Sequence, residues 1–350
     1  MQKPFAYCLL VLTLRLIPYV PRMKKLNYLL LLFLGIASCT TLPKSSANPD
    51  KQILTVGPGP EDMVVDTITG QPRLLISCNA RRKSDPYYGE INVYYPANGN
   101  VGVMKRTEPT NIHFCPHGID LVKVNDTLIL LVVNNDFRNH EQSILRYAVK
   151  AGELIFLNKI TDPLIVSPNA VTGFQDGTLL ISNDAGKMGD YTEALFKLKR
   201  CKIIYWNYNT CSVAAGKFCF ANGITNQAGK VYLASTLQNK VWQFDFKDGK
   251  LINQQTVARV NGPDNIRITD GNLYVACHLR FLAFLGNMKK AGNYSPTTVY
   301  RIDLASGHKS VAFFDDGAKL SAGSTGLAFH NKLYVSGVFD AKMAVVNNPK

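Results

Sequence analysis

The chain has 350 residues, of which 46% are hydrophobic and 18% are charged, and its formal net charge is +14. So large an apolar fraction excludes an intrinsically disordered protein, because disordered chains contain few apolar residues. Five of the cations and none of the acids lie in residues 1–39, which leaves a net charge of +9 (14 − 5) for the rest. Nucleic-acid-binding proteins cluster basic with aromatic residues, and this sequence does not. An anionic membrane surface therefore fits the charge better than nucleic acid does.

Residues 1–39 are predicted to be a signal segment for export. Two lysines precede an apolar run over residues 26–36, and small residues then lead to Cys39. The run is shorter than the roughly 20 residues that a helix needs to cross a bilayer. Met23, directly before the lysines, is a candidate for the true start of the protein.

Residues 36–39, with the sequence Ile-Ala-Ser-Cys, resemble a bacterial lipobox. The resemblance implies that Cys39 is lipidated and becomes the first residue of the mature chain. The protein would then be an exported lipoprotein, anchored to a membrane and facing the periplasm or the cell exterior. The alternative is an ordinary cleaved signal in which Cys39 is incidental. Residues 40–50 are predicted to be a flexible tether, so the folded domain is expected to span residues 51–350.

Export predicts an oxidising compartment, so the cysteines of the folded part need an interpretation. Their spacing does not match a zinc site. Cys201 and Cys211 flank a predicted hairpin and are close enough in sequence to pair. The alternative is that the thiols stay unpaired and pack as small hydrophobic groups.

The rest of the sequence is predicted to be all-β, because short β-branched and aromatic runs alternate with Gly, Asn and Asp turns. A four-residue strand pattern recurs six times, beginning at Leu74, Leu130, Leu179, Val231, Leu273 and Leu333. A second pattern precedes each copy by 9–14 residues, beginning at Pro60, Pro116, Pro168, Ala221, Pro263 and Ser324. Two patterns in step at this period are typical of four-stranded blades repeated around an axis. The sequence therefore predicts a six-bladed β-propeller, closed by pairing residues 52–56 with the last blade.

The second residue of the preceding pattern is polar in all six copies. These residues are Glu61, His117, Asn169, Asn222, Asp264 and Thr325, and Asp62 and Asn265 follow two of them. In a propeller such positions converge on one end of the central channel, where buried polar groups need a shared partner. Two carboxylates and three amides form a hard oxygen set that suits Ca²⁺, whereas zinc would require more His or Cys. The alternative is a water-filled channel with structural hydrogen bonds.

Several of these motifs resemble the blade motifs of the paraoxonase/arylesterase family, which is related to the gluconolactonase and regucalcin-like propellers. The most discriminating runs are Pro116-His117-Gly118-Ile119 and Phe220-Ala221-Asn222-Gly223-Ile224. Further matches are Glu61-Asp62, Leu131-Val132-Val133-Asn134, Asp264-Asn265-Ile266 and Cys277-His278. The resemblance runs in order from about residue 57 to 282 and more loosely to the end. It implies a calcium-dependent hydrolase that acts on lactones and aryl esters.

The resemblance also implies roles for individual residues. The matches to the family's catalytic calcium ligands are Glu61, Asn169, Asn222, Asp264 and Asn265. His117 matches its active-site histidine, and this imidazole would take a proton from the attacking water. The bound calcium would stabilise the oxyanion that develops on the substrate. Asp62 and the backbone of Ile119 match ligands of a second, structural calcium.

Three departures from the family pattern affect these roles. Asn135 stands where the family has a second histidine, and an asparagine cannot relay a proton, so Glu61 or another group would carry more of the catalysis. Ala170 stands where the family's second calcium site has an acid, which weakens the case for that site. His278 matches a pocket residue of the family, although a histidine at a strand end is more often structural.

The sequence leaves the function open between three hypotheses. The first is a hydrolase of small-molecule esters or lactones, and the second is a non-catalytic propeller that calcium stabilises and that binds a ligand or protein at the channel mouth. The third is a metal-free propeller of the strictosidine-synthase type, against which the number of candidate metal ligands argues. The pocket walls are expected to come from residues 81–88, 184–195 and 279–293. The last of these is rich in Phe and Leu, which favours hydrophobic lactones over sugar lactones.

Overall fold

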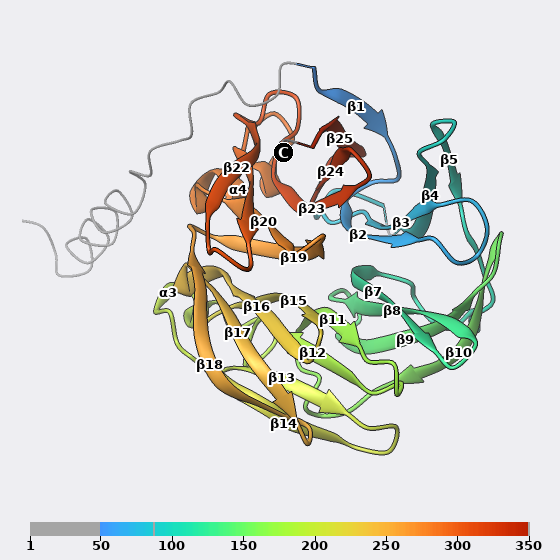
Figure 1. The fold of residues 1–350 in the computed structure, drawn as a ribbon, viewed down its shortest axis with the longest axis vertical. Helices are drawn as coiled ribbons and strands as arrows, with labels where there is room; N and C mark the ends of the chain where they lie inside the picture. Colours follow the sequence, from blue (N-terminus) through green and yellow to red (C-terminus); the bar gives the residue numbers. More distant parts are fainter. Residues whose placement is uncertain (1–49, 87, 349–350) are drawn as a thin grey trace, which may run out of the picture. The chain divides into compact units, whose positions relative to one another are not determined.

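The computed structural model describes residues 50–86 and 88–348, and in this part of the chain six β-sheets surround a common centre (Figure 1). Each sheet is a blade in which neighbouring main strands pair antiparallel. The predicted all-β fold with six blades is thereby confirmed. The predicted signal segment with Cys39 and most of the tether lie outside the described residues.

Each blade begins with an inner strand that starts at one of the six polar motifs. Blade 1 contains β2 (Pro60–Asp66), β3 (Arg73–Asn79), β4 (Gly89–Tyr95) and β5 (Asn100–Val103). Blade 2 contains β7 (Pro116–Val124), β8 (Thr127–Asp136), β9 (Glu141–Val149) and β10 (Glu153–Ile160), with the short β6 (Lys105–Arg106) parallel to β10 at its edge. Blade 3 contains β11 (Pro168–Gly173), β12 (Leu179–Asn183), β13 (Cys201–Trp206) and β14 (Cys211–Phe218).

The second half of the ring follows the same plan. Blade 4 contains β15 (Ala221–Gln227), β16 (Lys230–Ser235), β17 (Lys240–Lys247) and β18 (Lys250–Arg259). Blade 5 contains β19 (Pro263–Thr269), β20 (Asn272–His278), β21 (Thr297–Asp303) and β22 (Lys309–Asp315). Blade 6 contains β23 (Gly323–Phe329), β24 (Lys332–Gly337), β25 (Lys342–Asn347) and, as its outer strand, β1 (Gln52–Thr55).

The ring closes within blade 6, as the sequence predicted. Strand β1 pairs antiparallel with β25, so that Gln52 lies opposite Val345 and Thr55 lies opposite Lys342. The first and last strands of the propeller therefore share one sheet, which ties the two ends of the ring together.

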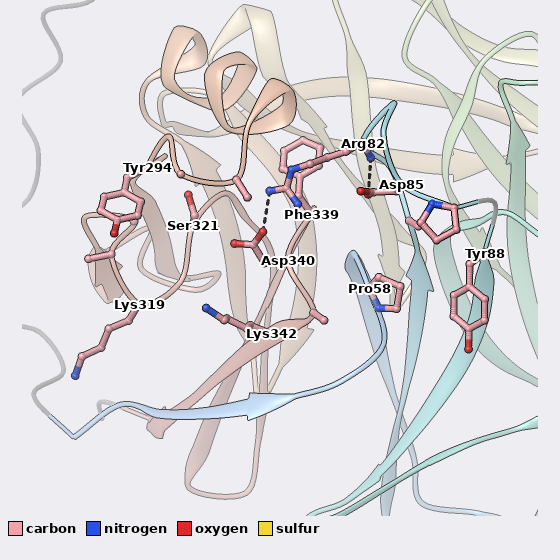
Figure 2. Close-up of a pocket in the computed structure, with 17 residues that line it drawn as sticks. Pro58, Arg82, Asp85, Tyr88, Tyr294, Lys319, Ser321, Phe339, Asp340 and Lys342 are labelled. Carbon is pink, nitrogen blue, oxygen red and sulfur yellow. Dashed lines mark hydrogen bonds and ion pairs between the residues drawn. The ribbon is translucent and has the colours of Figure 1, made fainter.

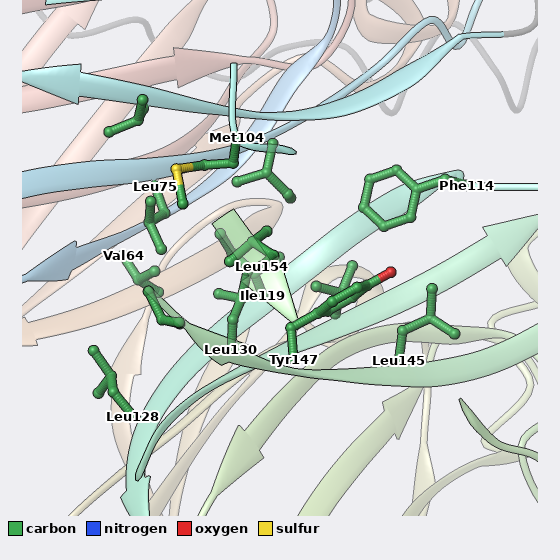
Figure 3. Close-up of a cluster of buried hydrophobic side chains, with 14 residues drawn as sticks. Val64, Leu75, Met104, Phe114, Ile119, Leu128, Leu130, Leu145, Tyr147 and Leu154 are labelled. Carbon is green, nitrogen blue, oxygen red and sulfur yellow. The ribbon is translucent and has the colours of Figure 1, made fainter. Parts of the chain in front are cut away.

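Apolar side chains fill the space between neighbouring blades. Six clusters of buried residues each combine side chains of two adjacent blades, and together they run once around the ring. Figure 3 shows the cluster between blades 1 and 2, where Leu75 and Met104 meet Ile119 and Leu130. This packing fixes where each inner strand faces the centre.

Every inner strand contains a β-bulge at its polar motif. In blade 1, for example, Pro60 pairs with Cys78 but Asp62 pairs with Ser77, so the inner strand has one residue more than its partner. The same one-residue excess occurs at the start of the inner strand in the other five blades. A bulge re-aims side chains at the edge of a sheet, and it lets two successive residues of one strand turn toward the channel.

The serine of the repeated strand pattern supports the bulge in three blades. The hydroxyl oxygens of Ser77, Ser182 and Ser336 each accept a hydrogen bond from a bulge N–H, all at 3.1 Å. These N–H groups would otherwise be buried without a partner in the ladder. The recurrence of this serine in the sequence thus has a structural cause.

Helical structure in the described residues is confined to the connections. The elements are α3 (Tyr191–Leu195), the 3₁₀ turn η1 (Thr236–Gln238) and α4 (Phe281–Lys289). None of the helices described is long and apolar enough to cross a membrane.

The predicted hairpin between Cys201 and Cys211 is formed by β13 and β14, but the two thiols are free. The register explains this outcome, because Cys201 lies opposite Phe218 whereas Cys211 lies opposite Trp206 at the other end of the hairpin. The structure therefore supports unpaired thiols and not a disulfide between Cys201 and Cys211.

Candidate metal centre and active site

The polar ring consists of the six polar residues at the starts of the inner strands, Glu61, His117, Asn169, Asn222, Asp264 and Thr325. Within it, the carboxylate of Glu61 is almost completely buried. Its Oε1 accepts hydrogen bonds from the Asn265 side-chain amide at 2.9 Å and from the Ser324 hydroxyl at 3.0 Å. These contacts join strands of blades 1, 5 and 6. The repeat pattern had singled out Thr325 in blade 6. The bulge of this blade instead turns its neighbour Ser324 toward the carboxylate of Glu61.

Asp264 is the second carboxylate of the ring, and three side chains donate to it or approach it. The Asn222 amide donates to its Oδ1 at 2.5 Å, and Oγ of Ser324 lies 2.8 Å from its Oδ2, so the single Ser324 proton is shared between this oxygen and Oε1 of Glu61. Nε2 of His278 lies 2.8 Å from the same Oδ2. Ser324 therefore connects the two carboxylates, and the structure brings four of the five predicted calcium ligands into one network.

Asn169, the fifth predicted ligand, lies on the inner strand of blade 3. Its amide nitrogen donates to Oδ2 of Asp184 at 3.3 Å. The Asn222 amide nitrogen is likewise engaged, so in both residues the carbonyl oxygen is the atom left for another partner.

Two of the predicted ligands, Asn169 and Asn222, carry a buried Oδ1 that has no hydrogen-bond partner among the described residues. Oε2 of Glu61 is also buried, and only Nδ1 of His117 approaches it, at 3.2 Å. A buried polar atom without a partner costs about 1–3 kcal/mol, so such atoms at one end of a channel indicate a missing ligand. Carboxylate and amide oxygens together fit calcium in the number and kind of its ligands. Within residues 50–86 and 88–348, no group of three His, Cys, Asp or Glu side chains could hold a metal by itself, so a zinc-type site is not formed there.

His117 lies beside Glu61 at the mouth of the channel. Its Nδ1 is 3.2 Å from Oε2 of Glu61, and 16% of its side chain is exposed. Burial by itself would raise the pKa of Glu61, but the charge of His117, helped by Arg81 and by the Ser324 hydrogen bond, lowers it to about 2. Glu61 is therefore a carboxylate at any physiological pH, and His117 is the ring residue in contact with solvent.

Arg81 is a further residue of the site that the sequence analysis did not single out. Its guanidinium donates to the backbone carbonyls of Gly59 at 2.7 Å and Pro116 at 2.9 Å, which precede Glu61 and His117 respectively. The arginine therefore holds the starts of two inner strands together and adds positive charge close to Glu61.

A second set of polar residues supports the ring, at the sixth position of the repeated strand pattern. This position is polar in five blades, where it holds Asn79, Asn135, Asp184, Thr236 and His278, and it is Val338 in the sixth. Thr236 accepts from the Asn222 amide at 3.1 Å and donates to the Pro263 carbonyl at 2.7 Å. Asp184 and His278 contact the ring residue of their own blade in the same way. The signal for this set was present in the sequence, two residues beyond the four that define the pattern.

Asn135, which replaces the family's second histidine, is one member of this supporting set. Its amide nitrogen donates to the Pro168 carbonyl at 3.2 Å, and its Oδ1 is buried without a hydrogen-bond partner in the described part of the chain. In Asp184, another member of this set, burial raises the pKa, and the Ser167 hydrogen bond and the charge of His117 only partly oppose this.

The predicted second calcium site does not fit the structure. Oδ2 of Asp62 accepts from the Ile119 amide at 2.9 Å and from the Arg267 guanidinium at 2.5 Å, and the same guanidinium nitrogen donates to the Ile119 carbonyl at 2.7 Å. Both proposed ligands are therefore already bonded to a positive charge. Ala170, on the neighbouring inner strand, supplies no carboxylate.

A cavity of about 650 Å³ opens at the same end of the propeller, between blades 1, 5 and 6. Its walls come from segments that precede an inner strand or connect the second strand of a blade to the third. Figure 2 shows Arg82, from the loop after β3, bonded to Asp340 at 2.7 Å across the cavity wall. None of the ring residues lines it, but Phe339 in its wall packs on Phe284, which packs on His278. A line of aromatic rings thus connects the cavity to the support of Asp264.

Comparisons with known proteins agree with the resemblance seen in the sequence. The arylesterase family profile matches residues 76–345. Human serum paraoxonase/lactonase 3 is 24% identical over 243 residues, which cover 65% of this chain and 67% of that protein. A gluconolactonase from Xanthomonas campestris has a similar structure, with a TM-score of 0.57 over 89% of this chain and 96% of its own and 14% sequence identity, which supports the fold alone. Since the matched segment covers most of the chain, this protein belongs to the arylesterase family.

Proposed function

We propose that this protein is a calcium-dependent hydrolase of lactones and aryl esters, with its active site at the polar ring. Membership of the arylesterase family supports ester or lactone hydrolysis in general. The calcium dependence rests on one observation, the buried unpartnered amide oxygens of Asn169 and Asn222 beside the carboxylate of Glu61. Their placement at the channel end beside a solvent-accessible histidine is the arrangement that metal-assisted hydrolysis requires.

The residues that would hold the ion are Glu61, Asn169, Asn222, Asp264 and Asn265. Calcium bound there would polarise the substrate carbonyl and offset the negative charge that develops on its oxygen. The chain prepares this site by keeping Glu61 ionised and by fixing Asp264 through the Asn222, His278 and Ser324 contacts. The carboxylates are thus held in place before a substrate arrives.

His117 would act as the general base. With a proton on Nδ1, held against the Glu61 carboxylate at 3.2 Å, Nε2 keeps its lone pair and can accept a proton from water. Its partial exposure places it where both water and substrate can reach it. Glu61 would orient the imidazole and balance the positive charge that His117 gains.

Hydrophobic lactones are proposed as substrates from the Phe- and Leu-rich segment 279–293. Phe284 of this segment packs on His278 and on Phe339, which lies in the wall of the cavity between blades 1, 5 and 6. Charged side chains such as Arg82 and Asp340 also line that cavity, so its lining does not by itself select an apolar substrate.

A second function follows from Asn135. Because its amide is engaged with the Pro168 carbonyl in place of a second histidine, the site lacks one proton carrier of the family pattern. The same ring would then serve as a calcium-stabilised binding site for a small ligand or protein at the channel mouth. Turnover separates the two functions.

The purified full-length protein is expected to hydrolyse phenyl acetate or at least one member of a panel of hydrophobic lactones. Activity should be lost in EGTA and should return when calcium is added in excess, because the oxyanion would otherwise have no cation near it. Initial rates under the three conditions provide the measurement. Full activity in EGTA would contradict the proposal, and inactivity together with a calcium-dependent rise in melting temperature would favour the binding function.

The substitution His117→Gln is expected to lower kcat by about 10²–10⁴-fold, the usual contribution of a general base. Calcium affinity should stay within about twofold of the original protein, since His117 is not among the ligands. Steady-state kinetics and calorimetric titration with calcium test the two parts. His308→Gln, at an exposed histidine, is the matched control. Unchanged turnover in the His117 variant would exclude this residue as the base and transfer that role to Glu61.

The substitution Asp264→Ala is expected to weaken calcium binding at least tenfold and to lower the melting temperature even in EGTA. It removes one ligand and leaves the groups that meet Asp264 without their acceptor. Asp264→Asn, which keeps the shape of the side chain, should lose calcium affinity with less loss of stability. Asp126→Ala, at an exposed acid, is the control. Unaltered calcium affinity in both Asp264 variants would refute the ligand set.

We also propose that the protein is an exported lipoprotein attached to a membrane through Cys39. The basis is the run of small residues directly before this cysteine. In a bacterial host, Cys39→Ser should move the protein from the membrane fraction to the soluble fraction. Mass spectrometry of the original protein should find a diacylglycerol-modified N-terminal cysteine. A mature chain that begins elsewhere would contradict the proposal.

A further inference from the structure

The guanidinium of Arg267 occupies the centre of the channel beneath the polar ring. Arg267 belongs to β19 of blade 5 and lies three residues beyond Asp264, which is about 10 Å along a strand. Its side chain is only 8% exposed, so it forms part of the interior of the propeller. A charge at this depth is stable only when its donors are paired.

The partners of Arg267 come from two other blades. Nε donates to the Met63 carbonyl at 2.9 Å, and one terminal nitrogen donates to both Asp62 at 2.5 Å and the Ile119 carbonyl at 2.7 Å. The other terminal nitrogen lies 4.0 Å from Oδ1 of Asp120. One arginine of blade 5 therefore binds strands β2 and β7 of blades 1 and 2, across the channel from its own blade.

These partners are the oxygens that a second, structural calcium would need. A calcium ion and the guanidinium cannot both bind here, because Asp62 Oδ2 already accepts two hydrogen bonds and the two cations would repel each other at a few ångströms. Ala170 independently deprives this place of a further carboxylate. The two observations concern different blades and agree.

We infer that Arg267 takes the place of a second calcium ion, so that the cation joining blades 1, 2 and 5 is supplied by the chain itself. The guanidinium offers a fixed fork of donors that matches one carboxylate and two carbonyls. Because this cation is covalently attached, chelators cannot remove it. The inference concerns this second position alone and does not depend on hydrolysis at the polar ring.

The number of calcium ions per chain tests the inference without any substitution. The full-length protein is dialysed to equilibrium against calcium, and its metal content is measured by atomic emission against protein concentration. One ion per chain is expected, and two ions per chain would overturn the inference. A count of zero would contradict the calcium dependence proposed above while still agreeing with an arginine in the second position.

The stability of Arg267 variants in EGTA is the second test. Arg267→Gln should lower the melting temperature by roughly 5–10 °C, since breaking a buried ion pair leaves the opposite charge unpaired. Arg267→Lys, which keeps the charge but not the fork, should melt at an intermediate temperature. Arg280→Gln, at an exposed arginine of the same blade, is the matched control. If Arg267→Gln has the same melting temperature as the original protein, the inference is wrong. If that variant does not fold, an intermediate melting temperature of Arg267→Lys supports it and an unchanged one refutes it.

Discussion

The centre of this propeller depends on one extra residue in each inner strand. Regular strands would turn alternate side chains toward and away from the channel, and each blade would then present one residue at a given height. The bulge lets blades 1, 5 and 6 present two successive residues each, as with Glu61 and Asp62 or Ser324 and Thr325. Two channel-facing residues in some blades give this end of the ring more oxygen atoms for binding a cation than one residue per blade would.

The buried charges around this end are arranged in balanced groups. Glu61 faces His117 and Arg81, and these partners overcome the effect of burial on its pKa. Its neighbour Asp62 faces Arg267, but burial outweighs that charge and raises the pKa of Asp62. Two successive carboxylates of one strand thus have opposite pKa shifts, because the bulge directs them to different partners.

The fold could be predicted from the sequence because its signal repeats. Six copies of two motifs at a constant phase leave few alternatives to a propeller, and the pairing of β1 with β25 follows from the need to close a ring. Four of the five candidate calcium ligands were identified for the same reason, since they occupy equivalent positions, and the fifth, Asn265, directly follows one of them. Arg81, Ser324 and Arg267 were missed because each acts through contacts between blades, which no spacing within one repeat reveals. Asp184 and Thr236 could have been predicted from the sequence. They lie at the sixth position of the repeated strand pattern, which was defined over only its first four residues.

The positive charge is provided differently at the polar ring and at Arg267. At the ring it would come from a bound ion that takes part in function, whereas Arg267 is a side chain that stabilises the fold. On the proposed assignment, the cation at the channel mouth exchanges with solvent and sits where a substrate can reach it. The cation beneath it belongs to the chain and holds blades 1, 2 and 5 whether or not metal is present. Loss of calcium would then expose unpartnered oxygens at the mouth but leave the centre of the ring joined. On that assignment, the protein would lose and regain its active site with calcium without unfolding.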